Sequence, residues 1–147
     1  MVSLKDICDN IATLYRNVAT PTNATALRKA AGQAPHGVPA LPIVAVMPQT
    51  GDVIAETGSW VLTHHIDVNF YISKSTGDLP RQETQRQLWL PSLLAAPLSQ
   101  MTLGIVNVKS VLPTGYEFRE LPYGGQGYDG IIVHLDVIVR EPVTFTP

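Results

Sequence analysis

The sequence has little of three features that would point to a chemistry or a compartment. Cys8 is the only cysteine in 147 residues, which excludes an internal disulfide framework and a zinc site built from several cysteines. The formal net charge is -2, so no strongly basic surface is available to drive non-specific binding to nucleic acid. No apolar run reaches the length of about 18 residues that a membrane span needs, and the N-terminus shows no signal-peptide pattern. We therefore expect synthesis in a reducing cytoplasm.

What the sequence does contain is enough apolar material for one core. Hydrophobic residues make up 45% of the chain, and a domain of this size buries about 70% of the surface that its unfolded chain exposes. We expect a single domain over residues 1–147. Prolines and glycines cluster at residues 20–42, 77–80, 91–97 and 113–130, and these clusters mark the boundaries between elements.

The strongest local pattern predicts an N-terminal helix over residues 4–18. Ser3 is a suitable N-cap, Asp6 lies in the first turn, and Pro21 follows the end. We interpret Cys8 as a small core residue because it belongs to the apolar stripe. The stripe repeats at helical spacing and consists of Leu4, Ile7, Cys8, Ile11, Leu14, Tyr15 and Val18.

Residues 19–40 form a long connection with an alanine-rich centre. Loops longer than about 15 residues are usually functional or partly disordered. The segment is therefore either an arm that binds a partner or a linker with one short helical turn near residues 25–31.

Two strands follow. Residues 41–47 are apolar and bounded by Pro42 and Pro48, which predicts an edge strand, because proline cannot donate to a sheet. Residues 60–72 alternate, with apolar side chains at even positions apart from His64, which predicts a long strand with one buried face.

A second helix is expected over residues 80–96. Asp78 can cap it and Pro80 suits its first turn, whereas Pro91 should kink or end it. Trp60 and Trp89 are interpreted as core residues, with a partner-binding surface as the alternative.

The last third predicts strands and turns only. We expect a strand at 105–112 with Val106 and Val108 on one face, a turn at 113–115, a short strand at 116–121, a flexible hairpin tip at 123–127 and a final strand at 131–140 closed by Pro142. The whole order predicts an α+β domain with an antiparallel or mixed sheet of four to five strands, flanked by two main helices.

Motifs for catalysis or cofactor binding are weak. Residues 125–130 match G-x-G-x-x-G, but a strand follows them where a dinucleotide site needs a helix. No G-x-S-x-G nucleophile motif occurs. A metal or ligand site could combine His64 and His134 with Asp67 or Asp136 across paired strands, although histidines on half-buried strands are more often structural. We expect no enzyme activity and no cofactor.

The arrangement of the whole chain, over about residues 1–140, resembles the tail terminator or tail completion proteins of long-tailed bacteriophages. The resemblance rests on the N-terminal helix, the strand at 66–72, the polar-to-apolar helix, the Thr102-Leu103-Gly104 turn into a strand, and the Tyr128-Asp129-Gly130 turn that opens the last strand. This chain departs from the family pattern at Ile105, where the family often has a second glycine, and in its long 19–40 segment.

The resemblance implies a non-enzymatic virion protein of the tail or neck, made in the host cytoplasm. It implies a homo-oligomeric ring, commonly a hexamer, on the end of the tail tube, where it stops tube polymerisation and meets a head–tail connector or stopper protein. It implies no membrane partner and no sequence-specific nucleic acid, and is compatible with DNA passing through the ring. We place the contacts in the 19–40 segment, the 73–80 loop, the 122–130 tip and the 41–47 edge. The candidate interaction residues are Pro35, His36, Val38, Lys74, Asp78, Tyr123, Gln126 and Tyr128.

Three alternatives remain at this point. A head–tail connector or head-closure protein of the neck would share the small α+β fold. A ligand-binding or enzymatic domain would use His64, Asp67, His134 and Asp136. A non-viral interaction module would stay monomeric or dimeric.

Overall fold

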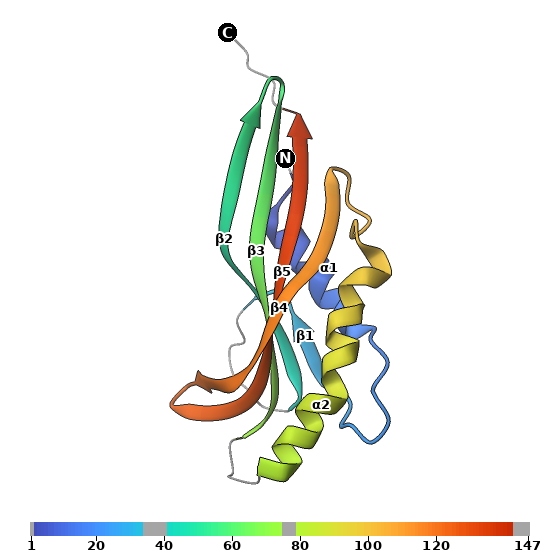
Figure 1. Ribbon diagram of the computed structural model, residues 1–147, viewed down its shortest axis with the longest axis vertical. Coiled ribbons are helices and arrows are strands. Elements are labelled where there is room, and N and C mark those ends of the chain that lie inside the picture. The colour runs from blue at the N-terminus through green and yellow to red at the C-terminus, as the bar shows by residue number, and fades with distance from the viewer. Residues whose placement is uncertain (1, 34–40, 75–78, 143–147) are drawn as a thin grey trace.

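The computed structural model describes residues 2–33, 41–74 and 79–142, which form a mixed five-stranded sheet with both α-helices on one face (Figure 1). The predicted α+β class with two flanking helices is confirmed. The strand order is β1-β2-β3-β5-β4, with β1 parallel to β2 and the other pairs antiparallel. The elements are α1 (Leu4–Arg16), β1 (Lys29–Ala31), β2 (Ile43–Glu56), β3 (Ser59–Lys74), α2 (Leu79–Ala95), the 3-10 helix η1 (Ala96–Gln100), β4 (Val108–Tyr123) and β5 (Gln126–Pro142).

Helix α1 forms where its apolar stripe predicts it. The Ser3 hydroxyl accepts a hydrogen bond from the Asp6 backbone N–H at 3.4 Å, which satisfies one of the free donors at the helix start. The helix ends at Arg16, two residues before the predicted end. Cys8 is buried against the sheet, as predicted, and burial raises the pKa of its thiol to about 11.

The helical turn expected near residues 25–31 is wrong, because Lys29–Ala31 form β1 beside β2. The Arg28 N–H donates to the Pro42 carbonyl at 2.8 Å, and the Arg16 guanidinium donates to the Ala30 carbonyl at 2.9 Å. Local helix propensity is a weak preference. Here pairing with β2 and the hydrogen bond from the Arg16 side chain on α1 satisfy the backbone of this segment in a strand instead.

The strand expected at 41–47 is longer and only partly an edge. β2 continues through Pro48, where the register with β3 shifts, and ends at a turn in which Gly58 has a φ of 77°. Residues 43–45 lie inside the sheet because β1 pairs with them. Beyond this point the described chain places no strand on the outer side of β2, so the missing N–H of Pro48 costs no pairing there.

The strands expected at 105–112 and 116–121 are present from Val108 onward, but the turn expected between them is wrong, because β4 is one continuous strand. Val106 precedes it and is exposed, in a turn where Leu103, Gly104 and Asn107 have positive φ. Residues 113–115 make only a register shift, which an outer strand tolerates. The hairpin tip is confirmed, with Gly124 and Gly125 at φ 59° and 79°.

Two apolar clusters lie on opposite faces of the sheet. The helix-side core contains α1, α2 and one face of β2, β3 and β5; its Phe70 and Trp89 rings lie 4.9 Å apart. The Tyr15 hydroxyl donates to the Leu93 carbonyl at 2.9 Å and ties α1 to α2. α2 continues through Pro91, so this proline does not end the helix. The smaller open-face cluster consists of Ile43, Ala45, Tyr71, Leu121, Tyr128 and Ile132.

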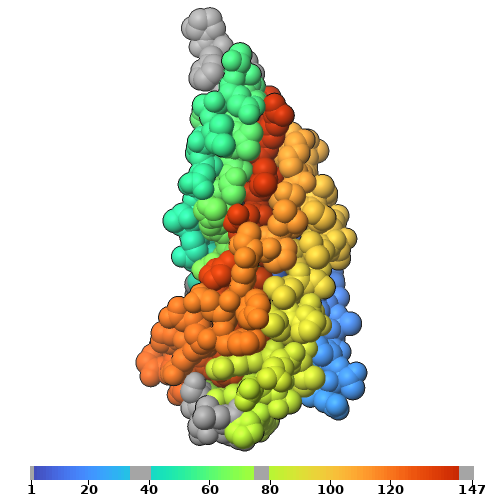
Figure 2. Space-filling view, viewed as in Figure 1, coloured from blue at the N-terminus to red at the C-terminus, as the bar shows by residue number. Residues whose placement is uncertain are grey.

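The β2–β3 hairpin extends beyond the part of the sheet that the helices cover. We call residues 48–63 the arm and the helix-free side of the sheet the open face. Residues 48–58 are all exposed, and the molecule narrows toward the arm tip (Figure 2). Trp60 lies half-buried on the arm, so the core prediction holds for Trp89 and not for Trp60. No helix in the described part of the chain is long and apolar enough to cross a membrane.

Candidate functional site

Four of the candidate interaction residues lie at the end of the molecule opposite the arm tip, where the β4–β5 hairpin and the start of α2 are found (Figure 1). Lys74 and Tyr128 are register partners, as are Tyr123 and Gln126. Tyr128 is only 6% exposed and packs edge-on against Tyr71 at 5.9 Å, so it stabilises the open-face cluster instead of offering a contact surface. Pro35, His36, Val38 and Asp78 lie outside the described residues.

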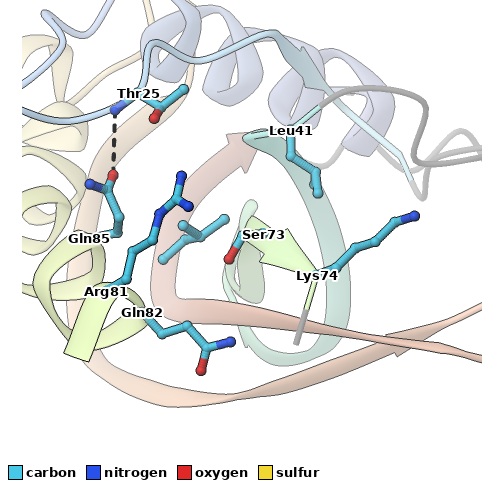
Figure 3. A pocket seen from close by; sticks show the side chains of 8 residues that line it. Thr25, Leu41, Ser73, Lys74, Arg81, Gln82 and Gln85 are labelled. Carbon is cyan, nitrogen blue, oxygen red and sulfur yellow. Dashed lines mark hydrogen bonds between the residues drawn. The ribbon is translucent and has the colours of Figure 1, made fainter. Parts of the chain in front are cut away.

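A cleft of about 260 Å³ opens beside Lys74, between the end of β3 and the first turns of α2 (Figure 3). The Gln85 amide oxygen accepts from the Thr25 N–H at 3.4 Å, so this side chain ties the 21–28 segment to α2. Figure 3 shows the Lys74 side chain pointing away from Arg81. The two cations do not converge on one point, and the cleft offers no focused anion site.

The histidine cluster of the open face is built differently from the sequence expectation. His64 pairs with Val137, so it faces the helix side, where burial lowers the pKa of its imidazole. His134 pairs with Asp67 on the opposite face. The alternative site that would combine His64 with His134 is therefore wrong, and it is His65 that lies on the same face as His134.

The first triad contains Asp52, His65 and Asp136. His65 Nδ1 lies 2.7 Å from Asp136 Oδ1 on β5, its register partner, and His65 Nε2 lies 2.8 Å from Asp52 Oδ2 on β2. One imidazole from β3 thus bridges the strands on both sides.

The second triad repeats the first with the strands exchanged. His134 Nδ1 lies 2.6 Å from Asp67 Oδ1 on β3, and His134 Nε2 lies 3.0 Å from Glu117 Oε2 on β4. In both triads Nδ1 bonds the inner carboxylate across the β3–β5 pair, and Nε2 reaches outward to the next strand. Together the two triads connect β2, β3, β5 and β4.

A short sequence signal accounts for this symmetry and was missed. The pattern His-x-Asp occurs in His65-Ile66-Asp67 and again in His134-Leu135-Asp136. Residues two apart on a strand share a face, and antiparallel pairing of two such patterns sets each histidine opposite the other strand's aspartate. The pattern is informative only once these strands are known to be neighbours.

The carboxylates shift the pKa values of His65 and His134 in the same direction. Hydrogen bonds to Asp52 and Asp136 raise the pKa of His65 above its usual value of 6.5. Hydrogen bonds to Asp67, and to a smaller extent Glu117, raise the pKa of His134 in the same way. Both imidazoles therefore hold their proton to a higher pH than a solvated histidine does.

The chemistry available to this cluster is limited by these contacts. Each imidazole uses both nitrogens on carboxylates, so neither has a free lone pair for a metal or a substrate proton. Within the described ranges, no group of three or more His, Cys, Asp or Glu side chains is arranged to hold a metal ion.

The arm is the other unusual surface. Val53 and Ile54 are 64% and 60% exposed, on a part of β2 whose outer side pairs with no strand among the described residues. Exposed edge strands are normally protected or used for contacts.

The sequence matches no protein-family model and has no significant match among curated proteins.

Proposed function

We propose that this protein is a structural virion subunit that assembles into a closed ring at the head-proximal end of a bacteriophage tail tube, where it ends tube polymerisation and joins the tail to the head. The observation that carries the proposal is the arm, which extends the sheet with residues that bury little surface within one subunit. The resemblance in element order supplies the terminator role. A head–tail connector of the neck would use the same ring.

The two outer strands of the sheet meet the geometric requirement of a ring. Identical subunits close into a ring through two different patches on each subunit. One outer strand is β4, and the other is β2 beyond Ala45 within the described chain. An outer strand can pair with a neighbour's strand through its backbone groups. Both strands carry exposed apolar side chains, namely Val53 and Ile54 on β2 and Leu112, Tyr116 and Phe118 on β4.

The end of the molecule opposite the arm tip is suited to contact a protein that stacks on the ring. The β4–β5 tip and the end of β3 lie far from the arm tip (Figure 1) and expose Gln126 and Lys74. A subunit with lateral contacts along its sheet edges would leave this end for the tail tube or for a connector protein.

The first experiment measures particle mass by light scattering at several concentrations, together with electron microscopy of the same sample. We expect a closed ring of about six subunits. The double variant Val53→Lys, Ile54→Lys should be monomeric with an unchanged circular dichroism spectrum, because it places charge on an apolar contact. Val106→Lys is the matched control, since Val106 is an exposed apolar residue that lies on neither outer strand.

A protein that stays monomeric both alone and with tail-tube protein would refute the ring. A ring that survives the arm double variant would refute the arm contact. Adding the ring to polymerising tube protein then separates the two roles, because a terminator shortens the tubes and a connector leaves their length unchanged.

A further inference from the structure

We propose that the two crossed triads act as a proton-dependent clasp, which fastens the outer strands β2 and β4 to the central β3–β5 pair across the open face. The clasp consists of His65 with Asp52 and Asp136, and of His134 with Asp67 and Glu117. It is a property of the single chain and does not depend on the proposed ring.

The protonated state fits the geometry. An imidazolium has two N–H donors, and ionised carboxylates only accept. In each triad both ring nitrogens lie between 2.6 and 3.0 Å from a carboxylate oxygen, so an imidazolium makes two charge-assisted hydrogen bonds at once.

A neutral imidazole cannot donate a hydrogen bond to both carboxylates of its triad. A neutral imidazole has one N–H, and its other nitrogen presents a lone pair to the second carboxylate. The inner carboxylates of Asp136 and Asp67 are 32% and 24% exposed, whereas the outer ones of Asp52 and Glu117 are 75% and 49% exposed. Because a less solvated hydrogen bond is stronger, the remaining proton stays on the inner side. Loss of the proton therefore releases the Asp52 and Glu117 side chains and removes the contribution of the clasp to holding β2 and β4, which stay paired through their backbone.

Three other charged or titratable groups lie near the two triads. Arg140 on β5 bonds Glu56 at 3.2 Å, and Arg119 lies two residues from Glu117 along β4. His64 lies on the other face of the sheet, where burial and, to a smaller extent, the charge of His65 lower the pKa of its imidazole. The surroundings of each clasp histidine are thus dominated by its two carboxylates.

The test follows the three described histidines by NMR as a function of pH. We expect His65 and His134 to titrate above 6.5 and His64, the control one residue away, to titrate below it. Over the range in which His65 and His134 lose their protons, hydrogen-exchange protection of β2 and β4 amides should fall about two- to fivefold, the size expected for exposed ion pairs. Protection factors, corrected for the intrinsic pH dependence of exchange, are the quantity compared.

Variants separate the clasp from a general pH effect. His65→Gln and His134→Gln should flatten the protection profile of their own outer strand, and His64→Gln should leave both profiles unchanged over the pH range in which His65 and His134 lose their protons. Asp52→Asn and Glu117→Gln keep the histidines and should lower the pKa of His65 and His134 respectively, so they provide a second test if a histidine variant folds poorly. Clasp histidines that titrate at or below 6.5, or outer strands whose protection falls equally in all variants, would overturn the proposal.

Discussion

The two halves of the β2–β3 hairpin have the same backbone pairing and opposite surroundings. In the base, Val44, Val46, Ile66 and Val68 are buried under α1 and against the helix-side core. In the arm, the register continues from Thr50 to Glu56, yet residues 48–58 are exposed. Hydrogen bonds between the two strands therefore continue to the hairpin turn, whereas burial of β2 stops before Pro48.

The difference indicates which residues stabilise the chain and which are available for another role. Large buried side chains in the base remove apolar surface from water and contribute most of the folding free energy. Exposed Val53 and Ile54 contribute little to a single subunit. Their apolar character is more consistent with selection for a contact than for stability.

The two tryptophans test this comparison with the largest expected effect. Trp89 on α2 is 1% exposed and packs against Phe70 in the base, and Trp60 is half-buried on the arm. We expect Trp89→Ala to lower the free energy of unfolding by about 3–5 kcal/mol, and Trp60→Ala by about 1 kcal/mol or less. Urea denaturation of both variants measures the difference. Equal losses would mean that the arm packs as tightly as the base.

A pair of glycines offers a smaller test. A Cβ at Gly130 would lie 2.7 Å from the Phe70 carbonyl oxygen, so Gly130→Ala must move backbone and should cost about 2–3 kcal/mol. Gly58 at the arm tip has φ 77° and no atom within 4 Å of such a Cβ. Gly58→Ala should cost about 1 kcal/mol from backbone strain alone. Thermal unfolding of both variants checks the order, and a larger loss at Gly58 would contradict it.

The smallest effect concerns pH at the junction between base and arm. Because the pKa values of His65 and His134 are raised on folding, their contribution is fully present below 6.5 and is lost as the pH rises through the folded values. The double variant His65→Gln, His134→Gln should remove this decline. Urea midpoints at about pH 5 and about pH 8 measure it.

His64 provides the opposite sign within the same strand. Its pKa is lowered on folding, so its contribution is present above 6.5 and is lost as the pH falls through the folded value. His64→Gln should therefore improve stability at the acidic end relative to the wild type. An unchanged pH profile in both sets of variants would show that neither face depends on histidine charge.

Local patterns predicted the elements that depend on neighbouring residues. The stripe of α1, the alternation of β3 and the glycine pair of the hairpin tip each specify a conformation within a few residues. The prediction failed at β1 and at residues 113–115, where alanine-rich and Pro/Gly segments were assigned their local preference. In both places a neighbouring strand decides the conformation.

The histidine cluster shows the same limit at the level of a site. The alternation of β3 correctly placed His64 and His65 on opposite faces of the sheet. Which of the two shares a face with His134 depends on the register between β3 and β5, and no local pattern contains that register. The candidate interaction residue Tyr128 was likewise placed correctly near a hairpin tip and is buried by contact with Tyr71, which is distant in sequence.

The sequence by itself determined the class of the fold, the amphipathic helix, the long alternating strands and the position of the glycine turn, because these follow from side-chain periodicity and backbone sterics over short distances. Only the tertiary structure decided that β1 joins β2, that β4 is continuous, that residues 48–58 of the β2–β3 hairpin stay exposed, and that two His-x-Asp patterns meet. These features depend on which strands lie side by side and in which register, and that involves contacts between residues far apart in the sequence, among them the packing of one face of the sheet against α1 and α2.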